Sequence, residues 1–369
     1  MRKHNAENER IKREYLRWLK GANGRSEQTL DIAAAAIDRF EAHAGFRPFK
    51  TFRREQAISF KEHLAGARHQ TTGKPLSKAT LYGTLKAVRA FFEWLSREDG
   101  YRSHVHLSDA AYFRPTDNDA RIATARRDRP APSLEQVQHV IASMPKGTVV
   151  QRRDRAVVAL TLLTGARDAA VASLRLKRLD LDRRELVQDA RDVNTKRAKT
   201  FTTWFFPVGE EAVEAVATWA AELKGTLLFG PDDPLFPSTR MDLDPLGLFA
   251  PVGVERRCWT TAAPIRELFR KAFEGAGLPY YGPHSLRRTL VQLAYDLNLG
   301  PRELKAWSQN LGHESMLTTL GSYGALSPTE QAEVMGSLAS RRPGVHPSQA
   351  DIAGMLRQVA SQIEGRSPA

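Results

Sequence analysis

The sequence has a single cysteine, Cys258, in 369 residues. An internal disulfide needs two cysteines, so none can form, and an intracellular, cytoplasmic protein is the simplest expectation. No apolar run approaches the ~20 residues of a membrane helix, so no membrane span and no membrane partner are expected. Residues 1–5 are polar and lead into no apolar stretch, so they are not expected to form a secretory signal.

Two cofactor signatures are also missing. The sequence has no G-x-x-x-x-G-K-[ST] loop for nucleotide phosphates. No Cys/His/Asp cluster accompanies His284, which argues against a metal site there. Cys258 lies beside Arg256 and Arg257, but no base or oxyanion site accompanies it, so we interpret it as structural. Neither ATP, a metal nor any other cofactor is therefore expected.

Positive charge is abundant and uneven. The chain carries 55 Lys+Arg against 42 Asp+Glu, a net charge of +13. Residues 1–130 hold 26 of these bases and 16 of the acids, a net of +10, and the remainder holds 29 and 26, a net of +3. Such a balance favours a polyanionic partner, most plausibly nucleic acid, gripped largely by the N-terminal part. A merely solvated basic surface is the ordinary alternative.

Hydrophobic periodicity divides the chain into segments. Helices are predicted over residues 7–20, 28–43, 54–66 and 80–96, which together form a small helical bundle over residues 1–113. Residues 114–132 are rich in Pro, Asp and Arg and are predicted to be a linker. Ser133 and Gln136 then form a capping box that opens a second domain over residues 133–340.

The second domain is predicted to be mainly α-helical with one small β-hairpin. Helices are expected over residues 152–164, 210–223, 261–276, 285–298 and 301–311, and a hairpin with a basic turn over 185–208. Residues 231–257, rich in Pro, Asp and Gly, are predicted to be a long loop. An amphipathic tail helix is expected over residues 347–364, within a C-terminal segment 341–369. The predicted fold class is thus mainly α with a small sheet in an α+β second domain.

An ordered set of arginine, histidine and tyrosine residues lies in this second domain. The segment Gly-Pro-His-Ser-Leu-Arg-Arg at 282–288 places His284 and Arg287 three positions apart, and hence on one helix face. The segment Leu-Gly-His at 311–313 and then Tyr323 follow, and Arg167 lies upstream in Thr-Gly-Ala-Arg. Two guanidiniums can clamp phosphodiester oxygens, a tyrosine can attack phosphorus, and imidazoles can move protons. The set predicts metal-free phosphodiester cleavage.

This ordered set, with a basic hairpin after its first arginine, resembles the catalytic half of the tyrosine recombinases, the phage integrase family. The resemblance covers about residues 133–340, and the helical region before it occupies the place of that family's core-binding DNA-binding domain. It implies a site-specific recombinase or integrase that rejoins DNA through a 3′-phosphotyrosyl intermediate. The integrase of a mobile element is the preferred role, and phage integration, transposition, resolution and chromosome-dimer processing all stay open. Its partners would be double-stranded DNA and further copies of itself, a dimer on one site and a tetramer in synapsis.

The resemblance assigns each residue of the set a role. Tyr323 is the nucleophile, Arg167 and Arg287 stabilise charge on the phosphorus, His284 assists proton transfer, and His313 hydrogen-bonds the phosphate. Each also has an ordinary structural interpretation: a surface arginine at a helix end, a capping histidine, or a tyrosine packed in a turn.

The hairpin lysine that this family uses as general acid has two candidates. Lys196 is preferred because it begins the basic turn. Counting back from Pro207, at the end of the second strand, favours Lys199 instead. Both therefore stay candidates for protonating the 5′-oxygen that leaves.

Two features depart from the family pattern. The position three residues after the first arginine, usually acidic, is Ala170, and whether Asp168 substitutes for it stays open. His313 and Tyr323 are ten positions apart, one more than usual. Gly321 gives the chain the freedom to absorb the additional residue.

Three further bases are predicted to contact DNA. Lys86 and Arg89 lie off the apolar stripe of helix 80–96, and Arg288 lies off the face that His284 and Arg287 share. The base-reading residues and the DNA target do not follow from the sequence.

The functional alternatives share part of this pattern. A type IB topoisomerase would use the same chemistry without exchanging strands. A catalytically inactive DNA-binding protein of the same fold would agree with the missing acid at Ala170, and an RNA-binding or structural protein would explain only the charge. The tail helix could dock on its own domain or on a neighbouring copy, and both stay open.

Overall fold

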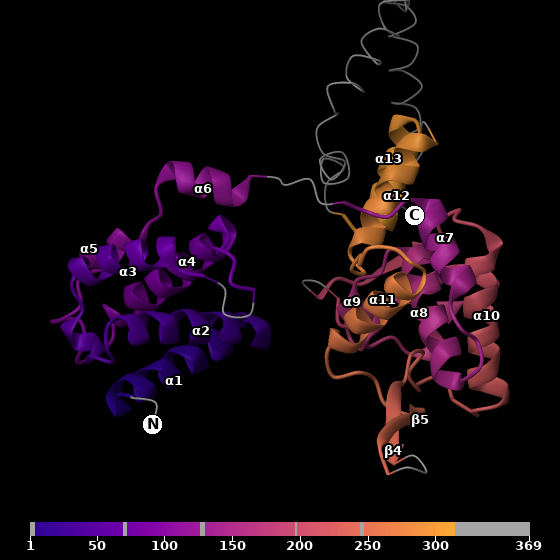
Figure 1. Ribbon diagram of the computed structural model, residues 1–369, viewed down its shortest axis with the longest axis horizontal. Coiled ribbons are helices and arrows are strands. Elements are labelled where there is room, and N and C mark those ends of the chain that lie inside the picture. Colours follow the sequence, from indigo (N-terminus) through magenta and orange to yellow (C-terminus); the bar gives the residue numbers. More distant parts are fainter. Residues whose placement is uncertain are drawn as a thin grey trace, which may run out of the picture. The chain divides into compact units, whose positions relative to one another are not determined.

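The structure, a computed structural model, describes residues 4–68, 72–125, 130–195, 198–243, 247–297 and 299–313. The chain divides between Arg127 and Asp128 into two compact units, drawn in Figure 1. The predicted nucleophile Tyr323, the predicted acid Lys196 and the tail helix lie outside the described residues. The domain boundaries expected at residues 113, 132 and 340 remain predictions.

The first unit contains the four predicted helices. The Asn5 side chain accepts hydrogen bonds from the backbone N–H groups of Glu7 and Asn8, and the Ser77 hydroxyl accepts one from Thr80. Caps of this kind stabilise a helix by about 1 kcal/mol. The elements are α1 (Ala6–Gly21), α2 (Glu27–His43), α3 (Arg54–Gly66), α4 (Lys78–Leu95), α5 (Leu107–Ala110) and α6 (Asp117–Thr124), with 3₁₀ turns at Phe49–Thr51 and Ala111–Phe113.

Phenylalanine rings fill the core of this unit. The ring of Phe40 on α2 packs edge-to-face against Phe52, Phe60, Phe92 and Phe113, with centroids 5.1 to 5.9 Å apart. All five rings are buried. Each such pair adds about 0.5–1.5 kcal/mol beyond the area that it buries. Because these rings come from α2, α3, α4 and the ends of the two 3₁₀ turns, the cluster fixes the bundle.

A buried lysine joins α1 to α2. The ammonium nitrogen of Lys12 lies 2.5 Å from a Glu9 oxygen and 2.7 Å from oxygens of both Asp38 and Glu41. Burial alone would lower the pKa of Lys12, but hydrogen bonds to the carboxylates raise it above its usual range. These three carboxylates are close enough to hold a metal ion. The ammonium group already occupies their centre, so the cluster is a structural ion-pair network.

Helix α6 lies inside the stretch predicted to be a linker. The Thr116 hydroxyl caps it by accepting a hydrogen bond from the Asp119 N–H, and Lys78 of α4 lies 2.7 Å from the Asp119 carboxylate. The helix buries no side chain. Hydrophobic periodicity could not reveal it because it has no buried apolar face.

Helix α8 (Val149–Thr164) forms the buried centre of the second unit. Its residues 156–164 are all buried, as expected for a helix that is covered on every side. A Thr148–Gln151 capping box begins the helix, and Gly165 ends it. The other helices are α7 (Leu134–Ser143), α9 (Asp168–Val171), α10 (Glu210–Gly225), α11 (Ala263–Gly275), α12 (Ser285–Asp296) and α13 (Pro301–Asn310).

A three-stranded antiparallel sheet confirms the predicted hairpin. Strands β2 (Glu185–Gln188) and β3 (Phe201–Trp204) pair with Glu185 opposite Trp204 and Gln188 opposite Phe201. Strand β1 (Leu179–Asp180) adds to the outer edge of β2. The mainly helical fold with a small sheet was therefore predicted correctly.

The prediction of a long loop over residues 231–257 is wrong. This stretch forms a second hairpin, β4 (Ser238–Leu243) with β5 (Phe249–Glu255). Pro251 and Gly253 in β5 concealed it, because such residues argue against a central strand. Both strands of a two-stranded ribbon are edges, so proline is tolerated here. Across the described ranges, no helix is long and apolar enough to cross a bilayer.

Candidate active site

Arg167 stands at a sharp turn between α8 and α9. Gly165 adopts a left-handed conformation there, with φ +58°, which costs glycine little. A Cβ on Gly165 would lie 2.8 Å from Leu311 Cδ2 and 3.1 Å from Leu290 Cδ1. The turn therefore packs directly on α12 and on the residue that follows α13. Arg167 then takes an extended backbone and begins α9.

Arg287 on α12 joins the segments of the site. Its Nη1 donates a hydrogen bond to the Gly165 carbonyl and its Nη2 donates one to the Leu311 carbonyl, each 2.5 Å long. Nη2 also lies 2.9 Å from His313 Nε2. The side chain is buried. One guanidinium thus connects the ends of α8 and α13 across more than a hundred residues of sequence.

Gly312 sets the position of His313. Its φ of +67° turns the chain out of α13, and the His313 N–H donates to the Ser308 carbonyl. A Cβ on Gly312 would lie 2.8 Å from Cζ of Phe201 on β3. The close approach of Phe201 and the helix end together direct His313 toward Arg287.

His284 is exposed and directly precedes α12. Partial loss of hydration, followed by the positive charges of Arg287 and Arg167, lowers the pKa of His284, and Asp168 partly opposes this. The imidazole is therefore neutral near pH 7 and able to accept a proton. Its electrostatic coupling to both arginines shows that the three side chains share one site.

Arg167 and Arg287 place two positive charges close together where burial removes much of their hydration. Burial lowers the pKa of Arg167, and burial with the charge of Arg167 lowers the pKa of Arg287 to about 9. Within the described ranges no carboxylate contributes to either shift. Burying like charges without a counter-ion is costly. A bound anion would relieve this cost, and an oxyanion such as phosphate fits two guanidinium groups.

The acid that is missing at Ala170 is not replaced by a bond from Asp168 to Arg167 in the described structure. Ala170 is buried in the core. The Asp168 carboxylate lies 2.8 Å from Arg266 Nε on α11 and also accepts the N–H of Ala169. Asp168 therefore ties α9 to α11, and it affects the site through its charge near His284.

The lysine and the nucleophile remain predictions. Lys199 is exposed in the turn before β3, whereas Lys196 and Tyr323 lie outside the described residues. Four of the predicted site residues are thus described together: Arg167, His284, Arg287 and His313.

The three predicted DNA contacts differ in their surroundings. Lys86 on α4 is exposed, and no ion pair of the described chain includes it. Arg89, one turn later, lies 2.6 Å from the Glu93 carboxylate and is partly buried. Arg288 is half-buried on α12, next to Arg287. All three remain predictions, and Lys86 offers the most accessible charge.

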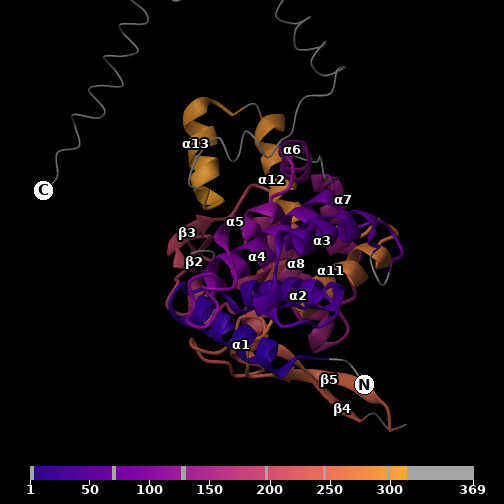
Figure 2. The same cartoon turned by 90° about the vertical axis from the view of Figure 1, so that its left-hand side faces the viewer.

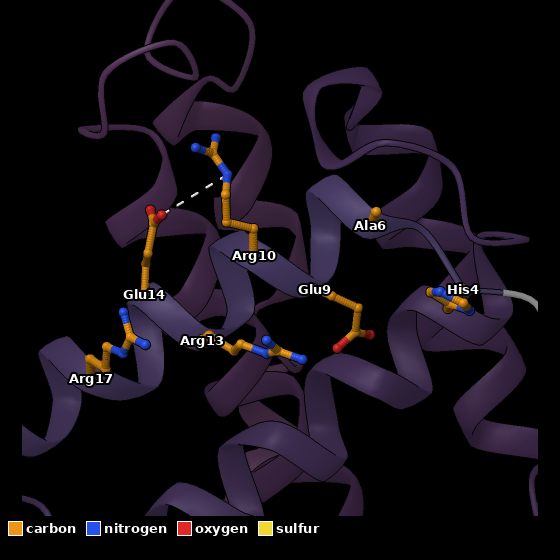
Figure 3. A pocket seen from close by; sticks show the side chains of 7 residues that line it. All are labelled: His4, Ala6, Glu9, Arg10, Arg13, Glu14 and Arg17. Carbon is orange, nitrogen blue, oxygen red and sulfur yellow. Dashed lines mark ion pairs between the residues drawn. The ribbon is translucent and has the colours of Figure 1, made fainter.

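A hollow of about 400 Å³ on α1 is a second place where arginines gather (Figure 3). Arg10, Arg13 and Arg17 follow one another along the helix, and Glu9 and Glu14 lie among them. Arg10 lies 4.0 Å from Glu14, an exposed pair that contributes little. Glu14 therefore offsets part of this charge, whereas Glu9 is already paired with Lys12.

Sequence patterns did not reveal the groups that position the site. The carbonyls of Gly165 and Leu311 hold Arg287, and Phe201 limits Gly312. Backbone carbonyls leave no pattern in a sequence. The two glycines in Thr-Gly-Ala-Arg and Leu-Gly-His were the available signal, and here both have positive φ.

Comparison with known proteins identifies the family of this arrangement. The profile described as "Phage integrase family" matches residues 133–330. The tyrosine recombinase XerC of Corynebacterium glutamicum is 27% identical over 247 residues, which cover 66% of this chain and 67% of that protein. The XerC of Lactobacillus delbrueckii subsp. bulgaricus is 25% identical over 317 residues, covering 84% and 92%.

Solved structures share the fold at lower identity. A lambda integrase dimer bound to a COC′ core site has a TM-score of 0.58 and 14% identity, covering 86% of this chain and 97% of that chain. The Tn1549 transposon integrase in complex with transposon right end DNA has a TM-score of 0.55 and 17% identity, covering 89% and 99%. These likenesses support the mainly helical fold with its small sheets.

Proposed function

Since the chain belongs to the phage integrase family, we propose that it is a tyrosine-type, site-specific DNA recombinase. The observation that carries this function is the pair of clustered arginines, Arg167 and Arg287, with His284 and His313 beside them and no carboxylate partner in the described structure. A scissile phosphate would supply the anion that this site lacks.

The proposed reaction consists of two transesterifications. The Tyr323 oxygen attacks the scissile phosphorus, and the bond from phosphorus to the 5′-oxygen breaks as the tyrosyl bond forms. His284, neutral near pH 7, takes part in removing the tyrosine proton, and Lys196 or Lys199 gives a proton to the leaving 5′-oxygen. A 5′-hydroxyl of another strand then reverses these steps. Because the phosphotyrosyl bond conserves the bond energy, no nucleotide cofactor is needed.

Arg287 contributes preorganised charge. The two carbonyls that hold it fix its direction before DNA binds, so little reorganisation is required in the transition state. Removing one such donor lowers a rate by roughly 10²–10³-fold in enzymes of other classes. Arg167, held by the Gly165 turn, would contact the other side of the phosphate.

The proposed partners are double-stranded DNA and further copies of the chain. The similar lambda integrase structure is a dimer on a core site. We expect a dimer on one site and a tetramer in synapsis. The net charge of +13 would strengthen binding to the phosphate backbone.

Covalent trapping tests this proposal. Wild type and Tyr323→Phe are incubated with nicked suicide duplexes made from DNA that flanks the protein's own gene, and SDS-resistant complexes are measured. Loss of one hydroxyl leaves the arginine site intact, so the variant should bind DNA within about two-fold of wild type and form no adduct. An adduct in the Tyr323→Phe variant would contradict the assignment.

An assay of strand exchange distinguishes a recombinase from a topoisomerase and from an inactive DNA-binding protein. Holliday junctions formed from two duplexes would support recombination. Supercoil relaxation without junctions would instead indicate a topoisomerase. Tight DNA binding with no adduct on any suicide duplex and no relaxation would indicate an inactive binding protein.

A further inference from the structure

The connection between β2 and β3 carries both candidates for the general acid, Lys196 and Lys199. We call its residues 194–200 the lysine turn. The Asn194 N–H, at the start of this turn, donates a hydrogen bond of 2.8 Å to the hydroxyl oxygen of Ser173. These two residues are 21 positions apart in the sequence. One side-chain hydroxyl therefore joins the lysine turn to the segment that follows α9.

The Ser173 hydroxyl is itself held in place. The residue is buried, and its hydroxyl donates to the carbonyls of Ala169 and Ala170, at distances of 3.2 and 3.1 Å. A hydroxyl can donate one hydrogen bond and accept others, so Ser173 binds α9 and Asn194 at the same time. Because α9 begins directly after Arg167, the first site arginine and the lysine turn are fixed to one short helix.

The far end of the lysine turn is tied to another part of the site. Phe201 begins β3 directly after the turn, and its ring lies where a Cβ on Gly312, the residue before His313, would collide with it. Strand β3 also lies against the end of α13 (Figure 2), where Asn310 exchanges hydrogen bonds of 2.8 Å with the backbone of Trp204. The lysine turn thus runs between one anchor at α9 and a second anchor at α13.

Ion pairs fix the chain just before Asn194. The Asp189 carboxylate accepts a hydrogen bond from the Arg191 N–H and lies 3.1 Å from Arg178 Nη2. The Asp192 carboxylate lies 2.8 Å from the same nitrogen. These contacts do not involve the lysine turn. Loss of the hydrogen bond from Asn194 is therefore expected to release the turn and to leave the end of β2 in place.

We propose that Ser173 is a positioning residue for the general acid, whose hydroxyl holds the lysine turn where an ammonium group reaches the leaving 5′-oxygen. The proposal rests on the proposed function, which gives the lysine its role. Proton transfer requires the donor within about 2.6–3.2 Å of the acceptor, so a displaced turn lowers the rate. Ala170, three positions earlier, has no polar side-chain atom that could hold the turn.

A duplex with sulfur in place of the 5′-bridging oxygen isolates this role. In the cleavage step the bond from the Tyr323 oxygen to phosphorus forms, the bond from phosphorus to the 5′-atom breaks, and its electron pair goes to that atom. A leaving oxygen needs a proton from the lysine. A leaving sulfur does not, because the pKa of a free thiol is only about 8.5. A defect in proton delivery therefore slows cleavage of the oxygen duplex alone.

Ser173→Ala is compared with wild type in the full chain on both kinds of suicide duplex. On the oxygen duplex the variant should form the SDS-resistant adduct about ten-fold more slowly or worse, a part of what a general acid contributes. On the sulfur duplex its rate should stay within about two-fold of wild type, which also shows that the variant is folded. Its affinity for DNA should not change.

Ser143→Ala is the matched control. The Ser143 hydroxyl donates a hydrogen bond of 3.1 Å to the Val140 carbonyl at the end of α7, so this variant loses a comparable bond away from the lysine turn. It should cleave both duplexes at the wild-type rate.

Lysine variants connect Ser173 to the acid itself. Of Lys196→Ala and Lys199→Ala, the one that removes the acid should be slow on the oxygen duplex and normal on the sulfur duplex. Adding Ser173→Ala to that variant should slow the oxygen duplex by less than about two-fold more, because both changes remove the same function.

Three results would overturn the inference. An equal loss of rate on both duplexes would show that Ser173 acts through Arg167 or through stability. A wild-type rate of Ser173→Ala on the oxygen duplex would show that the turn is held without this hydroxyl. Absence of any adduct with wild type on both duplexes would overturn the proposed function, and this inference with it.

Discussion

At the scale of the residue, the site is defined by charge without compensation. Arg287 donates to two backbone carbonyls, which accept its hydrogen bonds but carry no full negative charge. The Arg167 guanidinium makes no hydrogen bond or ion pair among those described for the chain, and it adds a second cation. The protein thus carries an unfavourable arrangement in the absence of DNA, as functional sites often do.

Replacing Arg167 by methionine should separate stability from activity. The apolar side chain keeps most of the volume and removes the like-charge repulsion, so the free energy of unfolding should rise by about 1 kcal/mol in thermal or urea denaturation. Adduct formation should fall by about 10²–10³-fold. Arg302→Met, at an exposed position, removes the same charge and should change neither quantity much. A lower stability of Arg167→Met would show that the fold already compensates Arg167.

At the scale of the element, glycines end the helices that carry the site. Gly165 after α8 and Gly312 after α13 both adopt positive φ and both touch a neighbouring segment. Each helix end is therefore fixed by conformation and by close packing together. The Gly165 turn packs against Leu311, which directly precedes Gly312.

Gly312→Ala should distort the position of His313. The left-handed conformation is strained for alanine, and the new Cβ would lie 2.8 Å from Phe201 Cζ. We expect a loss of about 1–3 kcal/mol in the free energy of unfolding and a lower rate of adduct formation, with DNA affinity little changed. Gly277→Ala is the matched control, since Gly277 has φ +73° and no atom within 4 Å of its added Cβ. Equal effects of both variants on adduct formation would refute a specific role for the Phe201 contact.

At the scale of the whole molecule, the excess charge is concentrated before residue 130. Counting charges there overestimates the number that can reach DNA. Lys12 is buried among carboxylates, and Arg89 is paired with Glu93. Lys86, one turn before Arg89, is exposed. The DNA-binding capacity of the chain therefore depends on which charges the fold leaves accessible.

Salt dependence of DNA affinity distinguishes these charges. Lys86→Ala should reduce the slope of log affinity against log salt by about 0.9, the value for one phosphate contact. Arg89→Ala should change this slope much less, because the Glu93 carboxylate already neutralises the charge of Arg89 in the folded protein. Both slopes are measured by fluorescence anisotropy on one duplex. An unchanged slope for Lys86→Ala would remove α4 from the phosphate contacts.

The sequence by itself determined the long helices of both units and the β2–β3 hairpin. It also led us to propose Arg167, His284, Arg287 and His313 as site residues. Helix periodicity and capping residues act within a few positions, so a single sequence records them. These site residues were proposed because their order and spacing resemble one family. Local patterns could not identify α6, which buries no side chain. They also could not identify β4–β5, whose proline and glycine resemble those of a loop.

Only the tertiary structure decided how these residues meet. The Arg287 guanidinium contacts Gly165, 122 positions away, and Leu311, 24 positions away. It also decided that Asp168 pairs with Arg266, and that the β4–β5 hairpin and α13 lie at opposite ends of the second unit (Figures 1 and 2). These contacts depend on how buried helices pack around α8, and packing joins residues irrespective of their separation in sequence. A linear pattern contains no such distances.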